Sequence, residues 1–222
     1  MIPWLQLDTA PLPGGGELKL MQRGGEFSIR LAGNELMNSR LHGSEEALAT
    51  LACARLRTAR PHVLVGGLGM GFTLRAALAA LGPEARVTVA ELVPAVVTWA
   101  RGPLAPLLAG SLDDPRVGVH AGEVGALMHG APASFDAILL DVDNGPEGLT
   151  IAANDALYGP SGLGAARAAL RPGGTLAVWS SGQDQAFSRR LRRSGFAVEE
   201  VRVRATGKRG ARHMIWLAAR GS

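Results

Sequence analysis

From Pro61 onward, short continuous apolar runs alternate with stretches whose apolar residues recur at helical spacing. Continuous apolar runs are typical of parallel strands covered on both faces. The predicted strands cover 63–65, 87–90, 116–120, 135–140 and 175–179, and the predicted helices cover 73–81, 94–101, 124–128, 162–170 and 183–193. Two last strands, 197–204 and 213–219, are joined by too few residues for a crossover, so we expect them to pair antiparallel. The pattern predicts an α/β fold built on a mainly parallel sheet.

The first 40 residues have a different pattern. Turn glycines separate short apolar runs such as 17–21 and 27–31, which predicts a small antiparallel β-meander or hairpins. The predicted organisation is therefore a small N-terminal β segment over 1–43 and a larger α/β domain over 44–222.

A helix is predicted between these two parts. Ser44 stands where its hydroxyl can cap the helix, and Glu45 and Glu46 fall in the first turn, where acidic side chains are favourable. We expect the helix to run to about Arg57, because Pro61 ends it.

Composition narrows the class of protein. The chain has 222 residues, 47% of them hydrophobic, which is enough for a full core. Its one cysteine, Cys53, excludes a disulfide framework and a cysteine-based zinc site, and no metal is expected. No run approaches the roughly 18 apolar residues of a membrane span, and the N-terminus lacks the pattern of a signal peptide. We therefore expect a soluble cytoplasmic protein with no membrane partner.

The basic residues are mostly arginine. The net charge is +4, yet Lys19 and Lys208 are the only lysines. Arginines gather late in the chain, over 189–193 and 202–212. We interpret them as a solvated surface, so nucleic acid is not an expected partner; the alternative is an anionic partner, as in an RNA methyltransferase. Binding driven by phosphate contacts would weaken steeply as salt rises.

A glycine-rich turn follows the strand over 63–65. Gly67, Gly69 and Gly71 alternate in it, and glycine lets a backbone turn tightly and approach a ligand. A dinucleotide fingerprint would need glycine where Phe72 stands, and the Gly-Lys-Ser/Thr of a phosphate loop is absent. The turn thus disfavours a pyrophosphate ligand. Tight packing of strand against helix is the other interpretation of these glycines.

Acidic residues follow the next two predicted strands. Glu91, followed by Leu92, ends one strand at a point where a carboxylate can accept both ribose hydroxyl protons. Glu123, after Gly122, follows the other, where a carboxylate can reach an adenine amino group. Carboxylates at the start of the next helices are the alternative. Ligands bind at this edge of doubly wound sheets, so the turns predict an adenosine site for S-adenosylmethionine or a relative. The predicted adenosyl-binding residues are Gly67, Leu68, Gly69, Gly71, Glu91, Leu92, Gly122 and Glu123.

The apolar strand over 135–140 ends in a polar turn. Asp141 follows it directly, and Asp143 projects to the same side if the extended geometry persists. Two carboxylates beside a sulfonium can hold a cationic amine and take its proton. We predict Asp141 as catalytic and Asp143 and Asn144 as substrate-binding. Turn carboxylates bonded to the local backbone are the alternative.

Together these residues resemble spermidine synthase. The resemblance covers about residues 25–200 and rests on Glu91 and on the runs 63–75, 113–117, 135–141 and 170–174. It implies the class I methyltransferase fold, a Rossmann-like sheet of seven strands with an antiparallel last strand, preceded by a small β domain. It also implies that Asp141 is the base that deprotonates the attacking amine, and it suggests a homodimer.

The chain departs from the pattern of that family in three places. Met70 stands at the position where the family has an aspartate that binds the amine of the donor. The family's Asp-Ser-Ser-Asp-Pro turn becomes the stretch over 141–145, which shifts the second carboxylate, and its Tyr-His-Glu stretch falls near 45–47. Adenosyl binding therefore carries over more fully than putrescine aminopropylation.

The function predicted from the sequence is a spermidine synthase-like transferase, an enzyme of polyamine biosynthesis. It would bind S-adenosylmethionine or its decarboxylated form and pass an aminopropyl group to a small-molecule amine. Two alternatives are a methyltransferase that uses S-adenosylmethionine on a small molecule, and a catalytically inactive homologue that binds nucleosides.

Overall fold

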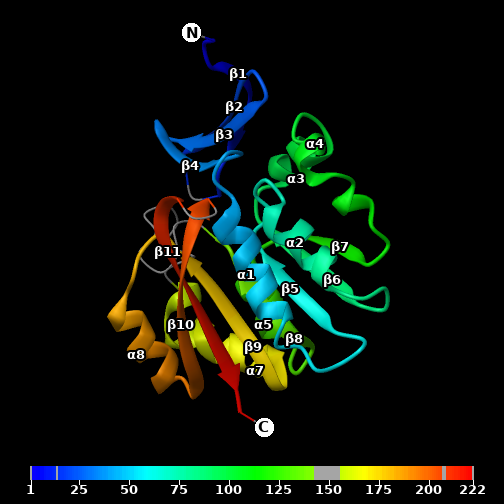
Figure 1. Ribbon diagram of the computed structural model, residues 1–222, viewed down its shortest axis with the longest axis vertical. Helices are drawn as coiled ribbons and strands as arrows, with labels where there is room; N and C mark the ends of the chain where they lie inside the picture. The colour runs from blue at the N-terminus through cyan, green and yellow to red at the C-terminus, as the bar shows by residue number, and fades with distance from the viewer. Residues whose placement is uncertain (1, 14, 143–155, 207–208, 222) are drawn as a thin grey trace.

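The computed structural model describes residues 2–13, 15–142, 156–206 and 209–221. They form a four-stranded sheet at the N-terminal end of the molecule and a seven-stranded sheet flanked by helices (Figure 1). No helix in this described part of the chain is long and apolar enough to cross a membrane.

The four-stranded sheet confirms the predicted meander. Its strands are antiparallel neighbours in chain order: β1 (Leu5–Pro11), β2 (Glu17–Arg23), β3 (Glu26–Leu31) and β4 (Asn34–Asn38). Leu20 and Ile29 are buried in one hydrophobic cluster with Val93 and Trp99 of the larger unit. The Asp8 carboxylate also accepts a hydrogen bond of 2.7 Å from the Trp99 indole. The small sheet therefore packs on the larger α/β unit, and a domain boundary between residues 43 and 44 stays a prediction.

The larger sheet has the predicted mixed topology. Its spatial order is β10-β11-β9-β8-β5-β6-β7. The strands are β5 (His62–Gly66), β6 (Arg86–Glu91), β7 (Val117–Ala121), β8 (Phe135–Leu140), β9 (Leu170–Ser180), β10 (Phe196–Thr206) and β11 (Arg209–Arg220). β11 runs antiparallel to both of its neighbours, β10 and β9, whereas β9, β8, β5, β6 and β7 are parallel. The α/β fold with an antiparallel last strand is confirmed.

Helices cover both faces of this sheet (Figure 1). One face carries α1 (Gly43–Cys53), α2 (Phe72–Ala80) and α3 (Pro94–Arg101), and the other carries α5 (Val124–Gly130), α7 (Pro160–Ala169) and α8 (Gln185–Arg193). A short helix α4 (Ala105–Leu108) and a 3-10 turn (Ser111–Asp113) connect α3 to β7. In β5, Val63 and Val65 belong to the core under α1 and α2, whereas Leu64 belongs to the core under α5 and α7. Such two-sided burial explains why the parallel strands are apolar without interruption.

Two local predictions about α1 were wrong. The helix ends at Cys53 rather than Arg57, and its N-cap is His42 without a capping side chain. The Ser44 hydroxyl is buried and donates instead to Glu45, with Nδ1 of His213 2.8 Å away. Packing of α1 against the strand β11 therefore takes the hydroxyl away from the helix end.

The turn predicted over 171–174 lies within a longer strand. β9 starts at Leu170, which pairs with Phe135, and the register then shifts before Ala137 pairs with Thr175. The strand thus accommodates this glycine-rich stretch as an irregularity in its pairing rather than ending there.

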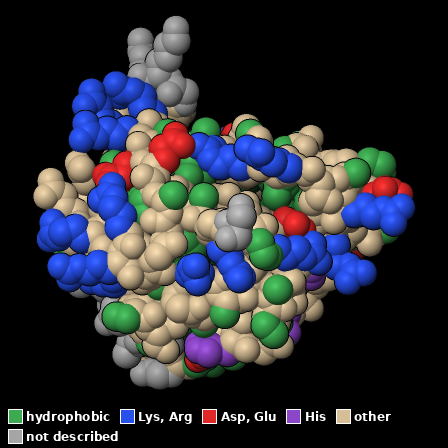
Figure 2. All heavy atoms as spheres, turned by 90° about the horizontal axis from the view of Figure 1, so that it is seen from below, with side chains coloured by type: hydrophobic (Ala, Val, Ile, Leu, Met, Phe, Trp, Pro, Cys, Tyr) green, Lys and Arg blue, Asp and Glu red, His purple; other side chains and the backbone are tan. Residues whose placement is uncertain are grey.

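Two arginines of α8 have structural partners. Asp184 caps the start of this helix by accepting hydrogen bonds from two backbone amides. At its end, Arg190 donates to the Tyr158 carbonyl and Arg192 pairs with Glu200 at 3.0 Å. Cations are favourable at a helix C-terminus. Figure 2 shows the basic side chains of the lower face in several separate groups.

Candidate active site

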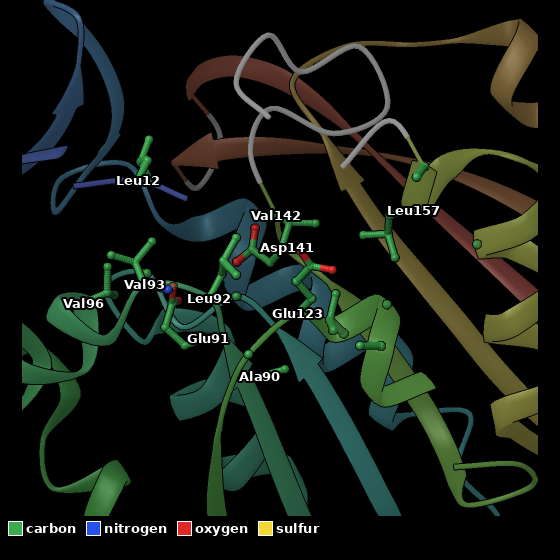
Figure 3. Close-up of a pocket in the computed structure, with 18 of the residues that line it drawn as sticks. Leu12, Ala90, Glu91, Leu92, Val93, Val96, Glu123, Asp141, Val142 and Leu157 are labelled. Carbon is green, nitrogen blue, oxygen red and sulfur yellow. The ribbon is translucent and has the colours of Figure 1, made fainter. Parts of the chain in front are cut away.

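A cavity lies at the carboxyl ends of the parallel strands, where the strand order changes direction between β8 and β5. It has a volume of about 380 Å³, within the range of small-molecule sites. Figure 3 shows Glu91, Glu123 and Asp141 around the same hollow, from the ends of three different strands. Of the predicted site residues, the cavity is lined by Gly67, Gly69, Glu91, Leu92, Gly122, Glu123 and Asp141.

A second cavity of about 70 Å³ adjoins the main cavity. Leu68 and Gly71, which were predicted to bind the adenosyl group, line this second cavity instead. Gly69 and Asp141 line both, so the two spaces meet at the glycine turn.

The glycine turn is held closely between neighbouring elements. The Gly67 amide donates to the Ala90 carbonyl at 2.9 Å. A Cβ on Gly67 would stand 2.6 Å from the Asp141 carbonyl oxygen, and the residue has a φ of +89°. A Cβ on Gly71 would meet Leu108 at 2.6 Å. The packing interpretation therefore holds for Gly67 and Gly71, while Gly67 and Gly69 also line the main cavity.

Glu91 is a buried acid at the wall of the main cavity, with 7% of its surface exposed. Its two carboxylate oxygens accept amide hydrogens from Leu68 at 2.9 Å and from Val93 at 2.8 Å. Burial raises the pKa of Glu91, and these backbone hydrogen bonds counteract part of that rise. Each carboxylate oxygen has a further lone pair, so Glu91 can secure the loop and still accept a ligand hydroxyl.

Glu123 occupies the N-cap position of α5, yet its side chain makes no capping hydrogen bond. The residue is exposed and lines the main cavity, as His129 of the same helix does. Glu123 therefore stands at the start of a helix, as the alternative interpretation expected, and its side chain also lines the cavity without a capping hydrogen bond.

Asp141 follows β8 directly. Its amide donates to the Gly66 carbonyl at 3.0 Å, and its Oδ2 accepts a hydrogen bond of 2.6 Å from the Thr73 hydroxyl at the start of α2. Burial raises the pKa of Asp141 to about 6, and the hydrogen bond from Thr73 limits that rise. The carboxylate thus lies where the two cavities meet, with a proton affinity suited to acid–base work near neutral pH.

Glu45 is an acidic residue of the site that the sequence reasoning did not assign. It lies in the first turn of α1 and lines the second cavity together with Asp141. Burial raises the pKa of Glu45 to about 7, the charge of Asp141 adds to the rise, and the hydrogen bond from Ser44 opposes it. The one signal for it in the sequence was the Tyr-His-Glu stretch of the resembling family, which falls near this position.

The apolar wall of the main cavity was also missed. Part of it comes from the N-terminal unit, through Leu12, Leu18, Ile29, Leu36 and Met37. Two predicted substrate-binding residues, Asp143 and Asn144, lie outside the described residues. Across 2–142, 156–206 and 209–221, leaving out residue 14, no group of three or more His, Cys, Asp or Glu is placed to hold a metal ion.

The sheet order and the position of the pocket define a Rossmann-type α/β protein. Two solved structures share this fold over 97% of the chain at 18% identity. They are spermidine synthase from Thermotoga maritima, with a TM-score of 0.77 over 73% of that chain, and a spermidine synthase in complex with the transition state analogue AdoDATO, with a TM-score of 0.75 over 72%.

Curated relatives agree with the structural neighbours. Polyamine aminopropyltransferase of Mycobacterium tuberculosis is 37% identical over 150 residues, and polyamine aminopropyltransferase 1 of Streptomyces coelicolor is 31% identical over 153. Each match covers 64% of this chain but 28% of the relative, so the matched region spans less than a third of the length of these proteins. No family model matches the chain. The resemblance predicted from the sequence is confirmed: the chain is spermidine synthase-like in sequence and in fold.

Proposed function

We propose that the chain is an aminopropyltransferase that takes its group from decarboxylated S-adenosylmethionine and passes it to a small-molecule amine. One observation carries the proposal: Glu91, Asp141 and the glycine turn line one cavity of nucleoside size. The relatives named polyamine aminopropyltransferase support the same chemistry.

Each part of the donor has a partner in this proposal. Glu91 accepts the ribose hydroxyls, Glu123 contacts the adenine amino group, and the backbone of Gly67 and Gly69 lies along the donor. The apolar wall from the N-terminal sheet excludes water from the sulfonium, which strengthens electrostatic interactions in the site.

The reaction is an in-line displacement. The lone pair of the acceptor amine attacks the carbon beside the sulfonium, the C–S bond breaks, and its electron pair stays on sulfur as a neutral thioether. The nitrogen gives up one proton, which Asp141 accepts. Positioning of the two reactants supplies much of the rate. We assign Asp143 and Asn144 to the acceptor amine.

A methyltransferase that uses intact S-adenosylmethionine is the second candidate, and Met70 favours it. This side chain is 3% exposed and lines the second cavity. A thioether is at most a weak hydrogen-bond acceptor, so it offers little to a free ammonium, whereas the intact donor carries its own carboxylate. The donor that the purified protein turns over decides between the two.

Adenosyl ligands are expected to stabilise the protein, and NAD is not, because Phe72 stands where a dinucleotide fingerprint needs glycine. At a ligand concentration of 100 times Kd, binding stabilises the folded state by about 2.7 kcal/mol. A thermal-shift series with S-adenosylmethionine, its decarboxylated form, methylthioadenosine and NAD measures this. Stabilisation by NAD alone would overturn the proposal.

The variant Glu91→Ala is expected to bind methylthioadenosine more weakly by about 1–3 kcal/mol, the usual scale for hydrogen bonds to a charged group. Calorimetric titration gives the affinity. Glu84→Ala is the matched control. Glu84 lies just before the first residue of β6, whereas Glu91 is its last, and it forms an exposed ion pair with Arg60. Equal affinities of the two variants for methylthioadenosine would show that Glu91 does not bind the ligand.

The assembly state and the location of the protein stay predictions. The resemblance suggests a homodimer, which sedimentation of the purified chain would test. Following the same protein in cells would test the expected cytoplasmic location.

A further inference from the structure

The second cavity continues the main one past the glycine turn. Gly69 and Asp141 line both spaces. Its volume of about 70 Å³ holds a small polar group but no nucleoside. A ligand whose adenosine fills the main cavity can therefore send a short substituent into the second.

The charged side chains among the described residues that line this cavity are both acidic. Glu45 and Asp141 line it from two sides, and none of the described residues around it is Lys, Arg or His. Glu46, the next acid on α1, is directed to an ion pair with Arg75 at 2.9 Å. Carboxylates removed from water without a counter-charge are unfavourable. The group that complements this cavity is a small cation, and a primary ammonium fits its size.

An independent observation on β9 indicates that the cavity is incomplete without a ligand or water. Trp179 lines it and is 8% exposed. Its indole Nε1–H has no hydrogen-bond partner within the described part of the chain. Buried polar atoms are rarely left unpaired. The indole N–H is a donor, so it calls for an acceptor, such as a water molecule beside the ammonium, that the described residues do not provide.

We propose that Glu45, together with Asp141, binds the terminal ammonium of the aminopropyl donor in this second cavity. This inference rests on the proposed function and names the residue that selects its donor. The neighbouring Met70 lacks the charge to hold an ammonium. A carboxylate from α1 therefore takes the place that the resembling family fills from the glycine turn.

The test compares two ligands that differ in the aminopropyl arm. Decarboxylated S-adenosylmethionine has the ammonium, and methylthioadenosine lacks it. The Glu45→Gln variant keeps the shape of the side chain. Its affinity for decarboxylated S-adenosylmethionine is expected to fall by about 10- to 100-fold, while its affinity for methylthioadenosine changes by less than about twofold. Glu46→Gln is the matched control, because Glu46 lies one residue away and does not line the cavity; it should leave the ratio of the two affinities unchanged.

A rescue variant separates binding from folding. Adding Met70→Asp to Glu45→Gln returns a carboxylate to the same cavity and is expected to restore most of the lost affinity for the ammonium ligand. If Glu45→Gln weakens both ligands equally, or neither, the inference is wrong while the proposed function stands. If the unmodified protein binds neither ligand, the proposed function fails and the inference fails with it.

Discussion

The Asp141→Asn variant is expected to lose turnover by about 10²- to 10⁴-fold, the contribution typical of a general base, while it retains its affinity for methylthioadenosine. The carboxylate lies where the two cavities meet, and its Oδ2 already accepts the Thr73 hydroxyl at 2.6 Å. An asparagine preserves the shape and a carbonyl acceptor for Thr73, but it cannot take a proton from the amine.

The control for this variant is Asp113→Asn, because Asp113 is an exposed partner of Arg101 away from both cavities. Steady-state rates and calorimetric affinities of the two variants are compared with those of the unmodified protein. Full turnover by Asp141→Asn would remove Asp141 from catalysis. A loss of binding in parallel with turnover would make it a binding residue instead.

The same assignment predicts how the rate depends on pH. A raised pKa means that the proton stays on Asp141 to a higher pH than on an ordinary aspartate, and only the ionised form is a base. Since the pKa of Asp141 is raised to about 6 and that of Glu45 to about 7, turnover should fall as the pH drops through this range. The residual rate of the Asp141→Asn variant should no longer fall in the pH range where Asp141 takes up its proton. A flat profile for the unmodified protein would contradict the assignment.

The second large effect is expected at Gly67. An alanine there would place its Cβ 2.6 Å from the Asp141 carbonyl oxygen, and the residue would have to keep a φ of +89°. The left-handed backbone alone costs about 1–2 kcal/mol for a residue other than glycine. Because the obstructing atom belongs to the backbone, the turn and the end of β8 must move apart. We therefore expect Gly67→Ala to lower the melting temperature and to abolish the thermal shift with methylthioadenosine.

Gly82→Ala serves as the control for Gly67→Ala. A Cβ on Gly82 meets nothing within 4 Å, and its φ lies outside the left-handed region. This variant should keep both the melting temperature and the ligand-induced shift. Normal ligand binding by Gly67→Ala would show that the turn can widen without loss, and that its close fit to β8 is not needed for the site.

Local pattern alone determined most elements of the α/β unit. The helix over 94–101 and the strand over 135–140 have the predicted bounds, because Pro94 suits a first helical turn and an apolar run ends at Asp141. The sites of Glu91 and Glu123 followed from a general property of parallel sheets, whose carboxyl ends meet at one edge. Sequence order was therefore enough to bring these acids to one cavity.

Only the tertiary structure decided the rest of the site. Glu45 and Asp141 are far apart in the chain and share a cavity because α1 packs beside β8 and β9. The same packing buries Ser44 against His213, which overturned its predicted role as a helix cap. Leu12 and Met37 reach the main cavity because the N-terminal sheet packs against the α/β unit beside it. Hydrophobic periodicity records which face of an element is buried, but the identity of the partner across that face depends on long-range packing.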